Sequence, residues 1–498
     1  MKNILILFLL LVGTTSCDNL LDVHPTDQYS AITYWTDKEN YDAALTGCYE
    51  SLYGVYSVWG GFYSLEMITP NSHDYHGSLT ELGNGSALSS NTIFLNFWRR
   101  LYGGIGRTNT FLDQIENAPF DDTDKAQMKG QALFLRALFY SQLIDLFGDC
   151  PLITQTPNME AHGKLPRTPV EDVVTKIIAD LDEAAGKLPV SYSSSNIGRA
   201  TKGATLALKA RILLFNKKWI EAAQTAKEVV DLGVFDLFPD YRGMYMPANE
   251  NNVEIIFDVQ YQSPHKMHNA DSDLKTLNRN APLKNLVDAY LMIDGKSITE
   301  SSLYNPDHPY ENRDPRLHQT IVCIGYPYNG KITKAEDVVT TGFGQKKLTS
   351  YPDDQTINIT MNNSELNLIV IRYAEILLTY AEALNEAGAS PSDEVYWAIN
   401  QIRKRPTVNM PEIDPGLNKE QMREVIRLER RIELAGEGLY YADIKRWKTA
   451  EIVNNGSVYN YKGEVIEVRV FDKDKHYLWP IPADEIQIND KLIQNPGW

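Results

Sequence analysis

The residues best suited to chemistry lie in a stretch without a sustained helical or strand period, residues 54–90, which is rich in Gly, Ser and Asn. Aromatic rings offer flat apolar faces on which a ligand can stack, and carboxylates and imidazoles can hydrogen-bond its polar groups. Long loops on a rigid scaffold often carry function. The candidate ligand contacts in this stretch are Trp59, Tyr63, Asp74, Tyr75 and His76.

A second group of aromatic residues lies in residues 234–363, which are rich in Pro, Gly, Asn and Tyr. The chain contains 28 Tyr and 8 Trp, and a visible share of them falls in such loop-like segments. We expect Tyr304 and Tyr326 to contribute to the same kind of binding surface. For each of these residues the alternative is an aromatic side chain that only packs beneath its loop.

A catalytic site would need a constellation of acids, bases or nucleophiles. Glu429, Glu433 and Glu437 recur every four residues and could align their carboxylates. Arginines are interleaved with them, however, which favours an ion-pair network over the acid/base pair of a glycosidase. We therefore predict that the protein is not an enzyme.

Two histidine pairs have a spacing that could chelate a metal on a helix: His73 with His76, and His265 with His268. Both pairs sit in loop-like sequence with no third ligand nearby, so we predict no metal site and no cofactor. Besides Cys17 the chain has only Cys48, Cys150 and Cys323, without a paired spacing. We expect these to be buried free thiols, with one disulfide at most.

The formal net charge of −17 argues against a nucleic-acid partner, because binding a phosphate backbone requires clustered Lys and Arg. Residues 1–17 carry one positive charge, an apolar run and small residues before Cys17, which is typical of a secretory signal peptide. The end of this segment resembles the lipobox of bacterial lipoproteins, which implies lipidation of Cys17. The alternative is a plain signal peptide with an unmodified Cys17. Residues 18–36 would then form an extended tether.

Residues 201–231 read as a complete pair of antiparallel helices that would position these loops. Ala204, Ala207 and Ala210 share one helical face, and apolar residues on the opposite face require the helix to be sandwiched. The second helix carries a stripe of Ile220, Ala223, Ala226 and Val230 before Gly233 ends it. Small residues on the contact faces suit stacked helical hairpins of the tetratricopeptide type, although an isolated hairpin is the alternative.

The remaining pattern predicts a mostly α protein, an α-α superhelix of tetratricopeptide-like hairpins, interrupted by a loop-rich α+β insertion at residues 234–363. A helical half spans residues 37–233, and a C-terminal helical part with a closing segment spans residues 364–498. The helices are expected at residues 37–53, 92–116, 124–147, 169–188, 366–387, 393–404, 419–434 and 440–449, with a strand at 252–260. Trp98 and Trp447 are predicted to be core residues.

Several long motifs, in order along the chain, resemble the SusD/RagB family of surface lipoproteins from Bacteroidetes: RALFYSQLIDLFGDCPLI (136–153), GRATKGATLALKARILL (198–214), RYAEILLTYAEALNEAG (372–388) and ERRIELAGEGLYYADIKRW (429–447). The closing WPIPADEI and QNPGW also fit. The resemblance implies a protein anchored by lipid to the outer membrane, facing the exterior, that captures an oligosaccharide and passes it to a SusC-like TonB-dependent transporter. Two alternatives remain: capture of oligopeptides by the same fold, and a tetratricopeptide scaffold that binds only proteins.

Overall fold

A computed structural model describes residues 34–193 and 196–498. The predicted signal peptide, its Cys17 and most of the tether at residues 18–36 lie outside the described residues. Among the helices that the structure does describe, none combines the length and the apolar character needed to cross a bilayer.

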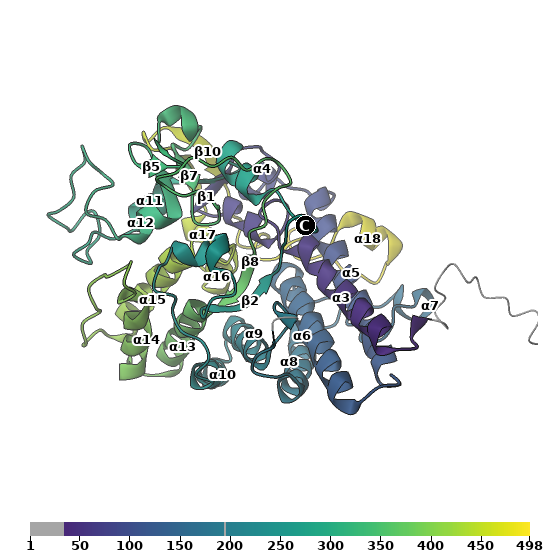
Figure 1. The fold of residues 1–498 in the computed structure, drawn as a ribbon. Coiled ribbons are helices and arrows are strands. Elements are labelled where there is room, and N and C mark those ends of the chain that lie inside the picture. The colour runs from purple at the N-terminus through teal and green to yellow at the C-terminus, as the bar shows by residue number, and fades with distance from the viewer. Residues whose placement is uncertain (1–33, 194–195) are drawn as a thin grey trace, which may run out of the picture.

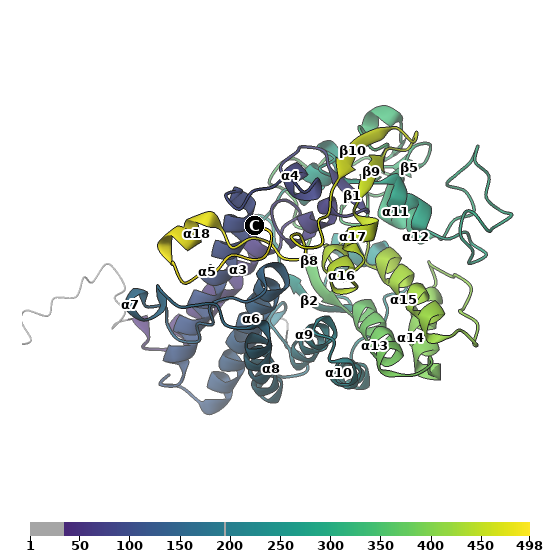
Figure 2. The same cartoon turned by 180° about the vertical axis from the view of Figure 1, so that it is seen from behind.

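The long helices pack side by side in a curved array, seen along the lower part of Figure 1 and from behind in Figure 2. Each helix from α3 to α10 contacts the next long one, and α10 then contacts α13, although residues 234–363 separate the two in the chain. Helix α13 in turn contacts α14 and α15. The mostly α, tetratricopeptide-like fold is thereby confirmed. The helices of the array are α3 (Lys38–Val55), α5 (Thr92–Ile115), α6 (Asp122–Phe147), α8 (Val170–Lys187), α9 (Lys202–Phe215), α10 (Trp219–Asp231), α13 (Tyr373–Ala387), α14 (Asp393–Arg403) and α15 (Lys419–Glu433).

The hairpin of α9 and α10 is sandwiched as its sequence predicts. The Thr201 side chain caps α9 by accepting a hydrogen bond from the Ala204 backbone N–H at 3.1 Å, and α9 is buried on both sides. The contact stripe of α10 differs from the prediction, because Ala222, Ala226 and Val229 are buried, whereas Ile220 is 63% exposed. Two residues correspond to about 200° of helix, so Ile220 faces away from the contact made by Ala222.

The predicted helix at residues 366–387 is wrong in its first part. Strand β8 (Leu368–Arg372) precedes α13 and pairs antiparallel with β2 (Ile255–Val259), which confirms the strand expected at 252–260. Every residue of β8 is buried. A short apolar run that is buried on both faces gives no period that distinguishes a strand from a helix.

The insertion at residues 234–363 is an irregular α+β segment, as predicted. It contains helices α11 (Lys284–Ala289) and α12 (Arg316–Thr320) and a π-helix at Ser272–Thr276. Its short strands pair antiparallel as β4 with β7 and β5 with β6, whereas β3 pairs with β1 from the N-terminal half. The strands are β1 (Ser72–Asp74), β3 (Asn280–Pro282), β4 (Ile321–Cys323), β5 (Pro327–Tyr328), β6 (Lys331–Ile332) and β7 (Phe343–Gln345).

The stretch at residues 54–90 is less loop-like than its composition suggests. A 3-10 helix, η2 (Phe62–Ile68), is buried throughout, and the short helix α4 (Thr80–Gly83) follows β1. Only the segment after β1 reaches the surface with exposed rings, those of Tyr75 and His76. The first half of this stretch is therefore core rather than loop.

The two tryptophans that were predicted to be core residues differ in burial. Trp98 is buried, as predicted, whereas Trp447 is half-buried and donates its indole N–H to Glu382 Oε1 at 2.7 Å. The three cysteines of the described residues are free and buried, and burial raises the pKa of each thiol to about 12. The remaining elements are α7 (Met159–His162), α16 (Tyr440–Arg446), α17 (Ala450–Val453), α18 (Ala483–Ile488), β9 (Gly456–Tyr459) and β10 (Val465–Arg469).

The three glutamates spaced by four residues belong to a buried ion-pair network, as predicted, which we call the Glu433 network. Arg372 contacts Glu254, Glu433 and Glu437, each at 2.8 Å. Helix α15 ends at Glu433, so Glu437 reaches Arg372 from the turn that follows. The other members are Arg316, Lys347, Arg405 and Glu429. Charges this deeply buried are tolerated because each is paired and hydrogen-bonded.

Candidate functional site

Pairing of β1 with β3 brings together two segments that are far apart in the sequence. The register joins Ser72 to Pro282 and Asp74 to Asn280, so the residues after β1 and those before β3 emerge at one place. Figure 1 shows β1 at the top of the molecule, beside the insertion and above the helical array. The array thus carries a surface to which both halves of the chain contribute.

Four residues from these two segments and Trp59, which precedes η2, form a group that we call the Trp59 cluster: Trp59, Tyr75, His76, Asp273 and Arg279. The Arg279 guanidinium carbon lies 4.1 Å from the centroid of the Trp59 ring, and its Nε lies 3.1 Å from Asp273 Oδ1. The Tyr75 and His76 rings meet edge to face, with centroids 5.0 Å apart. The cluster therefore combines an aromatic ring, an imidazole and a guanidinium on one surface.

Tyr75, which is 41% exposed, and the neighbouring His76 are the exposed rings of the cluster. Trp59 is half-buried, packs against the main core and has Arg279 over its ring. Its part is to support Arg279 by a cation–π contact, whereas Tyr75 has a ring available for stacking.

Hydrogen bonds hold the polar members in place. His76 Nε2 lies 3.0 Å from the Leu277 carbonyl oxygen, which fixes the imidazole against the insertion. Burial raises the pKa of the Asp273 carboxyl, although the nearby Arg279 and His76 oppose this shift. Asp273 is buried and orients Arg279, whose side chain remains 22% exposed. The guanidinium keeps N–H groups that can donate hydrogen bonds to a ligand hydroxyl or carboxylate.

Two of the residues proposed from sequence as ligand contacts lie in the interior. Tyr63 is 1% exposed and its hydroxyl donates to the Ile369 carbonyl oxygen. Asp74 is buried and accepts hydrogen bonds from the backbone N–H groups of His76 and Leu79, which shapes the turn after β1. We therefore remove Tyr63 and Asp74 from the candidate surface, and Asp74 acts by positioning the loop that carries Tyr75.

Tyr304 and Tyr326 belong to a different group, arranged around Tyr310. Tyr326 stacks on His318 with a centroid distance of 4.0 Å and lies 6.2 Å from Tyr310. Tyr304 is close enough to contribute, after burial, to the raised pKa of Tyr310. Among the described residues no ring contact joins this group to Tyr75. The structure therefore divides the predicted aromatic surface in two.

Asp273 and Arg279 were missed by sequence reasoning. They lie in the polar run DSDLKTLNR, residues 271–279, which has neither a strand nor a helix period. The available signal was a polar, charge-bearing run in an insertion already expected to bind ligand. The π-helix in this run also borders a cavity of about 250 Å³, lined on the insertion side by Lys275, Asn278 and Tyr328. No residue of the Trp59 cluster lines this cavity.

The two histidine pairs hydrogen-bond other groups in the fold. His73 Nδ1 lies 3.1 Å from Glu467 Oε2, and His268 Nε2 lies 2.7 Å from the Leu366 carbonyl oxygen. Within the described residues there is no group of three or more His, Cys, Asp or Glu side chains that could hold a metal ion. The Trp59 cluster places an exposed aromatic ring beside hydrogen-bonding side chains.

Comparisons with known proteins agree with this architecture. A model of the SusD family matches residues 244–498, and a model described as "Starch-binding associating with outer membrane" matches residues 21–214. SusD-like protein P2 of Formosa agariphila is 28% identical, with all of both chains covered. The starch-binding protein SusD of Bacteroides thetaiotaomicron is 24% identical over 80% of this chain and 77% of its own. The crystal structure of a SusD-like carbohydrate binding protein from Bacteroides fragilis has a TM-score of 0.85 at 26% identity, covering 93% of this chain and 100% of that one. Because a family model spans more than half of the residues and the fold agrees along nearly the whole length, the chain belongs to the SusD family.

Proposed function

We propose that this protein is a non-catalytic binding protein of the cell surface that captures oligosaccharides and delivers them to a SusC-like TonB-dependent transporter in the outer membrane. Membership of the SusD family supports this proposal, as do similar proteins named as starch-binding or carbohydrate-binding. A lipid on Cys17 would hold the protein to the outer membrane, with the ligand surface facing the exterior.

The observation that carries the proposal is the Trp59 cluster. An exposed Tyr75 ring stands beside His76, and Arg279 is held by Trp59 and Asp273. A sugar can stack its C–H face on the ring and share its hydroxyl groups with the imidazole and the guanidinium. The side chains that would hold the sugar are anchored at both β1 and β3, so binding requires little ordering of the loop.

Affinity electrophoresis and calorimetry against a panel of neutral and acidic polysaccharides test the proposal. We expect at least one glycan to bind and to be recovered with its chain length unchanged. The same panel includes extended peptides, because an aromatic surface with hydrogen-bonding side chains can also hold a peptide backbone. Binding of peptides without binding of any glycan would mean that the cargo is an oligopeptide rather than an oligosaccharide. Shortening of the glycan would show an enzyme.

Delivery is tested in cells that carry the partner transporter. We expect the protein to co-purify with the transporter from outer membranes, and Cys17→Ser to release it from the membrane fraction. A protein that binds other proteins only would support uptake equally well after Tyr75→Ala. Deleting residues 54–90 is a poor test of that alternative, because η2 is buried and its removal would disrupt the core.

A further inference from the structure

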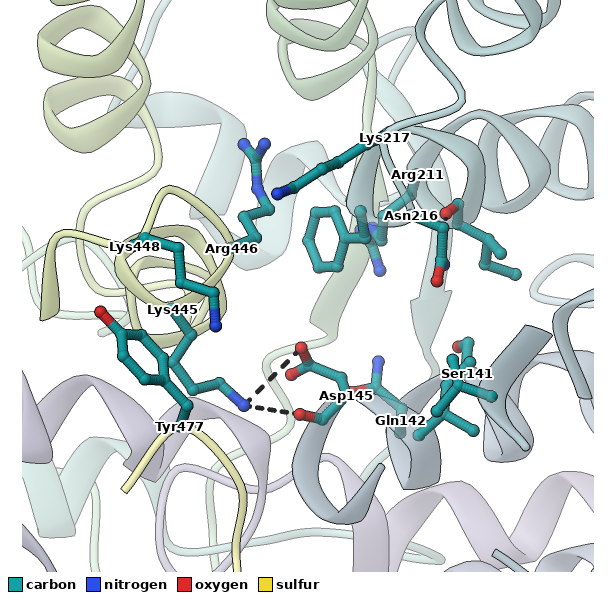
Figure 3. A pocket seen from close by; sticks show the side chains of 14 residues that line it. Ser141, Gln142, Asp145, Arg211, Asn216, Lys217, Lys445, Arg446, Lys448 and Tyr477 are labelled. Carbon is teal, nitrogen blue, oxygen red and sulfur yellow. Dashed lines mark hydrogen bonds and ion pairs between the residues drawn. The ribbon is translucent and has the colours of Figure 1, made fainter. Parts of the chain in front are cut away.

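A pocket of about 240 Å³ lies where three helices end, and Figure 3 shows it from close by. It is bounded by the last turns of α6, α9 and α16 and by residues that follow α9 and α16. We call it the lysine pocket. Its cationic lining residues are Arg211, Lys217, Lys445, Arg446 and Lys448, whereas Asp145 is the acidic lining residue. For a protein with a net charge of −17, this is a local reversal of sign.

Three of the five cations are already satisfied. Arg211 Nε donates to Glu375 Oε1 at 2.7 Å, and Arg446 pairs with Glu382 at 2.5 Å. Lys445 donates to the Asp145 carbonyl oxygen at 2.6 Å and lies 3.7 Å from the Asp145 carboxylate. Two of these cations are paired with carboxylates and Lys445 binds a carbonyl oxygen near a helix end, so the three need no ligand to explain them.

Lys217 and Lys448 differ from the other three. In the described part of the chain neither ammonium group has an ion-pair or hydrogen-bond partner, and Lys448 lies only over the Tyr477 ring, 3.7 Å from its centroid. Figure 3 shows the two side chains extending from opposite sides toward the space between them. Burial lowers the pKa of Lys448, the positive charge of Lys217 lowers it further, and only Glu451 opposes the shift. Both lysines are solvent-exposed and line the same pocket, whose acidic lining residue, Asp145, is already paired with Lys445.

Both lysines lie one residue after the C-cap of a helix, in a backbone conformation that has a conformational cost. Each has a φ of 58°, in the left-handed region that residues with a side chain rarely adopt. The Lys217 peptide is fixed by its N–H bond to Leu214 O at 3.0 Å, and the Lys448 peptide by its bond to Lys445 O, also at 3.0 Å. The backbone from which each lysine side chain extends is therefore held in a hydrogen-bonded turn.

Part of the remaining lining is apolar, although Ser141, Gln142 and Asn216 also border the pocket. Ile144, Val170, Ile212 and Phe215 contribute to the pocket wall, and Arg446 lies over the Phe215 ring at 5.1 Å. An apolar wall below two ammonium groups suits a small ligand with one anionic end and one hydrophobic face. Lysine provides a compact charge that binds carboxylate, sulfate or phosphate without demanding one planar geometry.

We propose that the lysine pocket binds an oxyanion, a carboxylate, sulfate or phosphate, which lies between Lys217 and Lys448 and is either free or carried on a ligand of about one sugar ring. This site shares no residue with the Trp59 cluster and does not depend on the function proposed for that cluster. Binding relieves the repulsion between the two lysines, and the cationic lining attracts the anion despite the negative charge of the whole protein.

Calorimetry of the full mature chain with sodium sulfate, sodium phosphate and sodium glucuronate, at one ionic strength set with NaCl, tests the proposal. Glucose serves as the neutral control for glucuronate. We expect at least one anion to bind and glucose not to compete for the site. Binding of glucuronate alone assigns the carboxylate of a sugar acid, and binding of sulfate or phosphate assigns a free oxyanion. Absence of binding by all three anions overturns the proposal.

Two double variants make the test specific. K217Q/K448Q removes both free charges of the pocket, and K218Q/K473Q removes the same net charge from exposed lysines outside its lining. We expect the first to lower anion affinity about tenfold or more, and the second to leave it within about twofold of the unchanged protein. Equal loss in both would mean that net charge alone acts, which overturns the site. Thermal unfolding of each variant shows that the fold is intact.

Discussion

The Glu433 network and the Trp59 cluster both contain an arginine beside a carboxylate and an aromatic ring, yet the two have different surroundings. In the network, Arg372 is 1% exposed and its donors are taken by three glutamates. In the cluster, Arg279 is partly exposed, and among the described residues its one carboxylate partner is Asp273. Pairing that is complete and buried fixes the fold, whereas incomplete pairing at the surface leaves donors for a ligand.

The largest expected effect comes from breaking the network. Arg372→Met leaves Glu254, Glu433 and Glu437 without their shared cation, and we expect it to lower the free energy of unfolding by about 3 to 5 kcal/mol. Urea denaturation measures this loss. Arg279→Met is the matched variant of the cluster and should cost less than about 1 kcal/mol while weakening glycan binding. Equal destabilisation by the two variants would contradict the comparison.

The second largest expected effect is that of low pH, which should destabilise the Glu433 network but not the Trp59 cluster. Burial alone raises the pKa of Glu437, but Arg372 and Lys347 outweigh it and hold the pKa at about 2, below the usual 4.5. Because the folded-state pKa is the lower one, this carboxylate contributes about 3 kcal/mol above pH 4.5, and the contribution is lost as the pH falls toward 2. The urea concentration at the midpoint of unfolding should therefore decrease as the pH is lowered from 4.5 toward 2. Asp273 shifts in the opposite direction, so its protonation cannot cause such a loss.

Tyr75→Ala tests the cluster as a binding surface. Removing the exposed ring should weaken glycan binding by about 1 to 3 kcal/mol, with little change in unfolding free energy. Tyr459→Ala is the control, because Tyr459 is 46% exposed on β9, outside the cluster. Trp59→Ala should weaken binding by a similar amount through Arg279, but it should also destabilise the fold because Trp59 packs against the core. Calorimetry with the identified glycan compares the three variants.

Tyr63→Phe is expected to have the smallest effect. It removes the hydroxyl that donates to the Ile369 carbonyl oxygen and keeps the ring in the core. We expect a loss of about 1 kcal/mol in unfolding free energy, measured by urea denaturation, and no change in glycan affinity. A change in affinity without a change in stability would return Tyr63 to the ligand surface.

Much of the helical frame could be predicted from sequence. The α9–α10 hairpin has an apolar period, a Thr201 cap and small contact residues, and each of these signals is local. Strand β8 was mistaken for helix because its run of apolar residues is buried on both faces, which removes the alternation that identifies a strand. Local signals therefore gave the helices but not the strand that packs beside them.

The candidate site could be predicted only in part. Tyr75 and His76 were selected because they are ring-bearing side chains in a loop-like segment. The same signal also selected Tyr63, whose burial depends on contacts far away in the sequence. Asp273 and Arg279 could not be found, because they reach the cluster through the β1–β3 pairing. The paired segment Asn280–Pro282 has no strand character of its own.

The contact between α10 and α13 has a consequence for how this molecule can vary. Since the array closes through these two helices, surface loops within residues 234–363 can change in length without opening the helical frame, provided that β2 and the members of the Glu433 network keep their places. Doubling such a connection costs only about 0.6 kcal/mol in closure entropy. Surface loops of the insertion can therefore be lengthened or replaced while the helices that support them keep their packing.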